Sequence, residues 1–193
     1  MKPIAIMIDG GHIRVAAKKA GKTLDAELVE QLGLACCDAA ESIHRILFYD
    51  CSPFAGQVEL PVSGGTMTFP GSDGFLRRLA RRDLFAVRRG VLKFRGWIPK
   101  SIPIAGKALD DKDFKPDFEQ KGVDMRIGLD MANYSANRSV ELIALCTNDT
   151  DCIPAMKYAR RAGLQVALVC ITGASPAPEL LAHCDFAREV TWP

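Results

Sequence analysis

Four short apolar runs, separated by stretches with helical spacing, constrain the fold more than any other feature of this sequence. The runs cover residues 3–8, 45–49, 141–146 and 165–171. Continuous apolar runs of this length are typical of strands buried on both faces of a sheet. Apolar residues recur every three or four positions at 24–41 and 152–162, which indicates helices between the strands. This order predicts an α/β fold of three layers, with a central, mostly parallel sheet and helices on both faces.

The middle of the chain interrupts this alternation. Residues 50–73 combine Ser, Pro and Gly with little periodicity, which predicts either a functional loop or a concealed hairpin. A helix is expected at 72–82, followed by a hairpin at 85–97 that turns near Gly90. Residues 100–116 are expected to form a further loop.

The length of 193 residues fits one domain, within which 51–116 is expected to be a variable basic insertion. Nine basic residues and one acid, Asp83, lie between Arg77 and Lys100, so this segment carries a net charge of +8. Because the whole chain carries +2, the remainder carries −6. An acidic body with one basic segment favours a polyanionic partner, although a solvated helix and edge strand would carry the same charges. The insertion is also a candidate interface for a homo-oligomer.

The cysteines and the hydropathy pattern indicate a reduced, cytoplasmic protein. The seven cysteines are odd in number, include the adjacent pair Cys36 and Cys37, and form no CxxC motif. We expect them to be small buried hydrophobic residues rather than disulfides or zinc ligands. No run reaches 18 apolar residues, and the apolar start of the chain is too short for a signal peptide, so no membrane association is expected.

Aspartates follow two of the predicted strands. Asp9 ends the first run and precedes two glycines, whereas Asp149 and Asp151 follow the run at 141–146. A third position, Asp124, lies in the first turn of a helix expected to begin near Val123. Helix capping or the helix dipole would explain each acid singly. Because ligand sites in parallel sheets lie at the carboxyl ends of strands, the four acids are expected to gather at one edge.

Asp130 follows Asp124 by six positions, which places it about 120° further around the same helix. We therefore expect Asp130 to be solvated or to support the acids without joining them.

Clustered carboxylates without His or Cys favour a hard divalent cation, Mg²⁺ or Mn²⁺, and such an ion fits phosphoryl chemistry. The basic segment would then contact nucleic-acid phosphates. The candidates for these contacts are Arg88, Arg89, Lys93 and Arg95. Three aromatic residues, Phe85, Phe94 and Trp97, would stack on bases, although burial in the core explains Phe85 and Phe94 better.

Three blocks of this sequence resemble the NYN domain family of the PIN-like nuclease superfamily, in its bacterial LabA-like (DUF88) branch. The blocks are IMIDGGH at 6–12, KGVDMRIGLDM at 121–131 and LCTNDTDCIPAMKYARRAG at 145–163. They occur in the order that the family shows and span most of the chain, whereas the middle, about 51–116, is variable in the family.

The resemblance implies a Rossmann-like PIN fold and a metal-dependent nuclease that acts on RNA, with single-stranded DNA as a further substrate class. It implies catalytic and metal-binding roles for Asp9, Asp124, Asp149 and Asp151. It also implies supporting roles for the remaining motif residues, which are Thr147, Asn148, Asp130, Lys121 and His12. Two departures stand out, since His12 replaces the usual Asn and Cys152 the usual Phe. An inactive RNA- or protein-binding module with the same fold is therefore the alternative.

Overall fold

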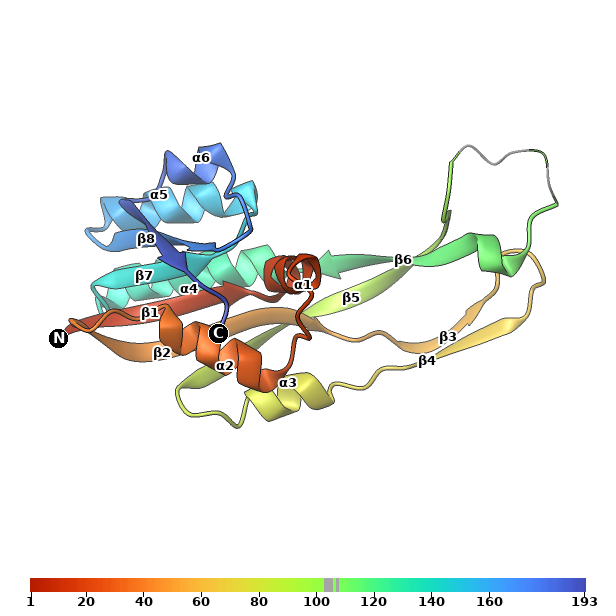
Figure 1. The fold of residues 1–193 in the computed structure, drawn as a ribbon, viewed down its shortest axis with the longest axis horizontal. Coiled ribbons are helices and arrows are strands. Elements are labelled where there is room, and N and C mark those ends of the chain that lie inside the picture. Colours follow the sequence, from red (N-terminus) through yellow and green to blue (C-terminus); the bar gives the residue numbers. More distant parts are fainter. Residues whose placement is uncertain (103–105, 107) are drawn as a thin grey trace.

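The computed structural model describes residues 1–102, 106 and 108–193 (Figure 1). Its strands are β1 (Lys2–Asp9), β2 (Glu41–Ser52), β3 (Ala55–Glu59), β4 (Thr66–Pro70), β5 (Phe85–Pro99), β6 (Phe114–Lys121), β7 (Leu142–Cys146), β8 (Gln165–Ile171) and β9 (Phe186–Val190). Its α-helices are α1 (Gly10–Lys19), α2 (Ala26–Ala35), α3 (Gly74–Leu79), α4 (Val123–Asn137), α5 (Ile153–Arg161) and α6 (Pro178–Leu181). Two 3-10 turns, η1 (Asp111–Asp113) and η2 (Thr150–Cys152), complete the described elements. None of the helices in this part of the chain combines the length and the apolar character needed to cross a bilayer.

The main sheet has the strand order β6-β5-β2-β1-β7-β8-β9. Neighbouring strands run parallel from β5 to β9, whereas β5 and β6 run antiparallel. This arrangement confirms the prediction of an α/β fold with a mostly parallel sheet. The chain passes from β1 to β2 on one side, and β7 lies on the other side of β1. The order therefore reverses between β1 and β7, and the carboxyl ends of these two strands form the topological switch point where ligands of such sheets bind.

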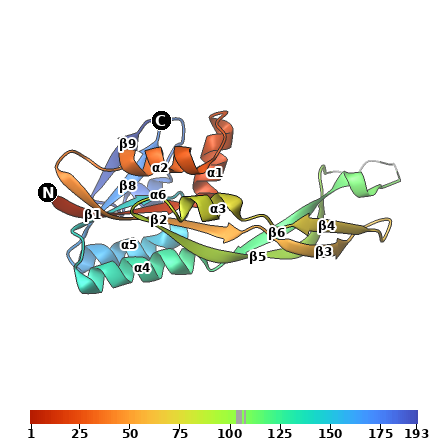
Figure 2. The ribbon, with the colours of Figure 1, turned by 90° about the horizontal axis from the view of Figure 1, so that it is seen from below.

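Alternate residues of β1 pack into two separate hydrophobic clusters. Ile4, Ile6 and Ile8 join α1, α2 and α3, whereas Ala5 and Met7 join α4, α5 and α6. Because successive side chains of a strand point to opposite faces, the two clusters lie on opposite sides of the sheet. Figure 2 shows α2 and α3 on one side and α4 and α5 on the other.

A long projection, which we call the arm, extends from the body at the carboxyl end of β2 (Figures 1 and 2). It consists of the β3–β4 hairpin, residues 91–99 of β5, and β6. Five aromatic rings from these segments hold it together, with neighbouring centroids 5.4–6.0 Å apart, namely Phe54, Phe69, Phe94, Trp97 and Phe118. The Trp97 indole also donates a hydrogen bond of 2.8 Å to the Glu59 carbonyl. Residues 50–73 thus contain a hairpin, which was one of the two expected alternatives.

The predicted hairpin at 85–97 is wrong, because these residues belong to the single strand β5. Gly90 does not make a turn. A Cβ atom there would lie 2.7 Å from the Lys121 carbonyl oxygen and 2.9 Å from the Cys51 sulfur. Glycine is therefore required for the close approach of β5 to the end of β6. The loop expected at 100–116 is also too long, since β6 begins at Phe114.

Two further boundaries differ from those expected. The helix expected at 24–41 ends at Ala35, and β2 begins at Glu41.

The cysteines are free thiols, of which Cys36, Cys51, Cys146 and Cys152 are buried, whereas the remaining three are only partly buried. The expectation of buried cysteines is thus correct for four of the seven, whereas the other three fall short of full burial.

Candidate active site

Asp9 ends β1 and caps α1. It is 8% exposed, and its Oδ1 accepts hydrogen bonds from the backbone N–H groups of Gly11 (2.9 Å) and His12 (3.2 Å). The two glycines of the sequence make this turn possible. A Cβ atom on Gly10 would lie 2.8 Å from the Tyr49 carbonyl oxygen, and one on Gly11 would lie 3.3 Å from Asp9 Oδ1. The capping explanation for Asp9 is therefore correct, and it leaves the carboxylate at the switch point.

Thr147 connects the ends of β1 and β7. Its buried hydroxyl donates a 2.8 Å hydrogen bond to Asp9 Oδ2 and accepts one of 3.1 Å from the Asp149 backbone N–H. In the alternation of the two strands, Asp9 and Thr147 follow Met7 and Leu145, so they face the side covered by α4. Thr147 thus fixes the Asp9 carboxylate and the turn that carries Asp149.

The turn after β7 holds the remaining acids. Asp149 caps η2, and its Oδ1 accepts a 2.9 Å hydrogen bond from the Asp151 N–H. Asp151 is exposed. The Asn148 side chain binds a different segment, since its Oδ1 accepts a 2.6 Å hydrogen bond from the Ala177 N–H. Asn148 therefore ties the segment after β8 to the end of β7.

Asp124 faces this turn from the first turn of α4, where the sequence predicted it. Partial burial raises the pKa of Asp124, and the charges of Asp149, Asp9 and Asp151 raise it further. Because α4 also contacts η2, Asp124 lies near the turn that carries Asp149 and Asp151. The structure thus brings together the four acids at the carboxyl ends of β1 and β7.

The donor set fits a hard cation in its chemistry, because four carboxylates concentrate negative charge without a compensating base among them. The spacing of these carboxylates fits a metal ion less well than their chemistry does. In the described residues, no group of three or more His, Cys, Asp or Glu side chains stands close enough to hold a metal ion. Asp9 already accepts three hydrogen bonds, although a carboxylate has further lone pairs to offer. The residues that would hold such an ion are Asp9, Asp124, Asp149 and Asp151.

An open hollow of about 420 Å³ adjoins these acids, and Asp9, His12, Val15, Asn148 and Asp149 contribute to its lining. Burial lowers the pKa of His12, and the charge of Asp9 opposes that effect. His12 thus presents its side chain beside the acids from the first turn of α1.

Asp130 and Lys121 lie apart from this hollow. Asp130 Oδ2 accepts hydrogen bonds of 2.9 Å from the Tyr49 hydroxyl and from Arg88 Nε. These contacts fasten α4 to β2 and β5, so the expectation of a solvated Asp130 is wrong and that of a supporting position is consistent with the structure. Lys121 forms an ion pair with Glu119 on β6.

The predicted phosphate-binding residues divide into two groups. Arg88 pairs with Asp130 (2.9 Å) and Arg89 with Asp73 (2.8 Å), and these pairs fasten β5 to the neighbouring helices. Lys93 and Arg95 are exposed on the arm, where Arg95 Nε lies 3.4 Å from Glu119.

The three aromatic residues considered for base stacking have structural roles. Phe85 is buried in the core, whereas Phe94 and Trp97 belong to the aromatic cluster of the arm. The core explanation was correct for Phe85. Phe94 and Trp97 pack within the arm rather than in the core of the body.

The family model of the NYN domain matches residues 73–189, more than half of the chain. The chain belongs to the NYN domain family. NYN domains form part of the PIN-like nuclease superfamily. The matched range includes Asp124, Asp149 and Asp151 and begins after Asp9.

A crystal structure of a protein of unknown function from Vibrio parahaemolyticus is similar to this NYN chain, with a TM-score of 0.53 and 14% identity. The similarity covers 97% of this chain and 92% of the other, and it concerns the fold alone. No curated protein matches the chain.

Two residues near the site escaped the sequence analysis. Asp50 is 2% exposed at the end of β2, forms an ion pair with Arg14, and accepts a 2.8 Å hydrogen bond from the Cys51 N–H. The sequence carries a signal for Asp50, because this residue follows the apolar run at 45–49 just as Asp9 follows the run at 3–8. Gln120 is the second, since its side chain lies within 4 Å of the Cβ position of Gly11.

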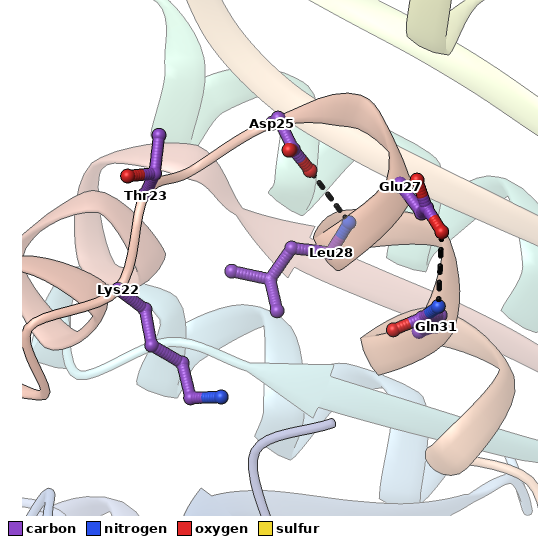
Figure 3. Close-up of a pocket in the computed structure, with 6 residues that line it drawn as sticks. All are labelled: Lys22, Thr23, Asp25, Glu27, Leu28 and Gln31. Carbon is purple, nitrogen blue, oxygen red and sulfur yellow. Dashed lines mark hydrogen bonds between the residues drawn. The ribbon is translucent and has the colours of Figure 1, made fainter.

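Another hollow, of about 280 Å³, lies along the segment before α2 and the first turns of α2, and it has a structural explanation (Figure 3). Asp25 Oδ1 caps α2 by accepting a 2.8 Å hydrogen bond from the Leu28 N–H, and Gln31 donates one of 3.4 Å to Glu27. These polar groups stabilise the start of α2, so the hollow adds no residues to the candidate site.

Proposed function

We propose that this protein is a metal-dependent ribonuclease of the LabA-like (DUF88) branch, which hydrolyses RNA phosphodiester bonds. The observation that carries the proposal is the placement of the acids around the switch point. The Thr147 hydroxyl bonds both Asp9 and the Asp149 N–H, Asp151 follows in the same turn, and Asp124 begins α4, which contacts that turn. Membership of the NYN family supports RNA as the substrate class.

In this proposal the four acids hold Mg²⁺ or Mn²⁺. Such an ion, when bound, neutralises phosphate charge and activates water. Thr147 orients the Asp9 carboxylate through the 2.8 Å hydrogen bond and so acts as a positioning residue. Asp130 holds α4, and thereby Asp124, against the sheet through Tyr49 and Arg88.

Phosphates further along the RNA are proposed to contact Lys93, Arg95 and Lys121 on the arm. Lys93 and Lys121 belong to the same face of the β5–β6 ladder, because Lys121 pairs with Val91, which lies two residues before Lys93 on β5. Arg88 and Arg89 are proposed as structural residues instead, since both are committed to ion pairs with helices.

The remaining proposals concern context. We propose a three-layer, Rossmann-like PIN domain over 1–193, with a variable basic insertion at about 51–116 that contributes the β3–β4 hairpin and the outer part of β5 to the arm. A cytoplasmic location and self-association through the insertion complete the proposal.

Cleavage of labelled single-stranded RNA and DNA, assayed with Mn²⁺, Mg²⁺ or EDTA, tests this function. Asp9→Asn and Asp149→Asn are expected to abolish metal-dependent cleavage. Asp25→Asn is the matched control, because Asp25 also caps a helix by a side-chain hydrogen bond but lies at the start of α2. Cleavage that survives in both site variants, or that disappears in Asp25→Asn as well, contradicts the proposal.

One observation favours an inactive RNA- or protein-binding module as the second candidate. In the described part of the chain no three-ligand group is preformed, and Asp9 already accepts three hydrogen bonds. This candidate predicts salt-sensitive RNA binding by the wild type, unaffected by EDTA, with no turnover in any metal. His12, in place of the usual Asn, is then the first residue to substitute.

A further inference from the structure

The hollow beside the acids continues into a second one along α1. This adjoining hollow is distinct from the one at the start of α2. It measures about 270 Å³, and its lining includes Lys19 together with 173–175 from the segment after β8. Both hollows share His12, Val15 and Asn148 in their linings. They therefore form one passage, which we call the α1 groove. Figure 1 shows α1 at the end of the body where the strands β1 and β2 terminate.

The chemistry of the α1 groove changes along its length. Asp9 and Asp149 lie at one end, and the Lys19 ammonium lies at the other. Between them stand the imidazole of His12 and the side chain of Val15, which is 56% exposed despite being apolar. His12 and Lys19 are seven residues apart on α1, which corresponds to two helical turns and about 10 Å.

The opposite wall of the groove is held in place by the candidate site itself. Asn148 Oδ1 accepts the 2.6 Å hydrogen bond from Ala177, and Asn148 lies directly beside Asp149 in the chain. Residues 173–175 precede this anchor and line the passage opposite α1. This hydrogen bond thus joins the turn that carries the acids to the segment that forms the wall.

We propose that the α1 groove holds the nucleotide next to the scissile phosphate, and that Lys19 binds the following phosphate of the RNA strand. The inference rests on the proposed function and extends it by giving the path of the substrate away from the acids. A nucleotide matches the order of groups in the groove, since its sugar and base need polar and apolar contacts and its next phosphate needs a cation. Lys19 then adds one phosphate contact beyond those proposed on the arm.

A simpler role for Lys19 is to stabilise the carboxyl end of α1 through the helix dipole. Lys18 provides the matched control, because both lysines lie in the last turn of α1. In the described residues, Lys18 is outside the lining of both hollows. If both lysines act only through the helix dipole, replacing either one should have the same effect on RNA binding. If Lys19 lines the groove, only its replacement should change RNA binding.

The test measures binding of a labelled single-stranded oligoribonucleotide in EDTA over a series of salt concentrations. For Lys19→Ala, the slope of log K against log salt is expected to become shallower by about 0.7, the value of one phosphate contact on a single strand. Lys18→Ala is expected to keep the wild-type slope. Ala174→Trp, which fills the groove without changing charge, is expected to weaken binding while thermal unfolding remains as in the wild type.

Equal slopes for Lys19→Ala and Lys18→Ala, or unchanged binding by Ala174→Trp, overturn the groove assignment. Wild-type RNA cleavage in the same preparation would leave the proposed function standing in that case. A wild type that neither binds nor cleaves RNA overturns both proposals, so the two failures are distinguishable.

Discussion

Replacing Glu41 with Gln is expected to lower the free energy of unfolding by about 2 kcal/mol, because it removes the charge that compensates a buried guanidinium. Arg188 and Glu41 have side chains that are each 8% exposed, and two hydrogen bonds of 2.6 and 2.9 Å join them. The amide of Gln keeps the shape and one acceptor. The loss should therefore fall below the roughly 3–5 kcal/mol typical of breaking a buried ion pair outright.

Asp38 provides the control for this substitution, since its carboxylate also contacts Arg188, at 3.1 Å, but is 69% exposed. Asp38→Asn is expected to cost no more than about 1 kcal/mol, as exposed ion pairs do. Thermal unfolding separates the two variants, because about 2 kcal/mol corresponds to roughly 4–8 °C in a domain of this size. Equal shifts for Asp38→Asn and Glu41→Gln would refute the reasoning from burial.

The same ion pair predicts a pH dependence. Burial by itself would raise the pKa of Glu41, but the hydrogen bonds from Arg188 and from the Asp38 N–H outweigh burial and lower it. A lowered pKa in the folded state gives stability that is complete above the ordinary value of about 4.3 and is lost as the pH falls through the folded value. The stability difference between wild type and Glu41→Gln should thus be constant near neutral pH and shrink below about pH 4.

Three other substitutions test the site and the arm. Thr147→Val should cost roughly 1–3 kcal/mol in urea unfolding and reduce RNA cleavage more than tenfold, whereas Thr147→Ser keeps the hydroxyl and should retain most of both. Gly90→Ala should lower the free energy of unfolding by about 1–3 kcal/mol in the same assay, since the new methyl group meets the Lys121 carbonyl. Gly128→Ala in α4, where a Cβ atom has room, should leave this free energy unchanged or raise it. Phe118→Ala should speed amide hydrogen exchange in the arm while the exchange of β1 and β7 stays slow, and uniform acceleration would contradict separate packing of the arm.

Local sequence signals predicted the parts of the site that depend on local structure. Asp9 follows a buried strand and precedes glycines, and α4 begins at Val123 with Asp124 in its first turn, as expected. The support given by Thr147 could not be predicted from geometry, because its hydroxyl meets a carboxylate 138 residues away. Asp50 carries the same local signal as Asp9, but it alternates to the opposite face of the sheet.

Elements of the arm were harder to predict because they depend on partners distant in the chain. The sequence of β6, FKPDFEQK, contains a proline and several charges, and it resembles a loop when taken alone. It forms a strand because β5 pairs with it and Phe118 packs against Phe54 and Phe69. Gly90 was predicted to form a turn for the same reason, since glycine is required there by the Lys121 backbone rather than by its neighbours in sequence.

The unbroken path of β5 changes what the charge of the basic segment means. Two adjacent arginines on a strand point to opposite faces, so Arg88 reaches Asp130 on α4 while Arg89 reaches Asp73 before α3. A net charge of +8 along the sequence therefore does not form one basic surface. Arg88 and Arg89 join helices to the two faces of the sheet, whereas Lys93 and Arg95 are exposed on the arm. The other exposed arginines lie on or directly after α3, and they are Arg77, Arg78, Arg81 and Arg82. It follows that Lys93→Ala should make the salt dependence of RNA binding shallower, whereas Arg88→Ala should mainly lower the stability of the fold. The reverse result would argue against the arm as a phosphate-binding surface.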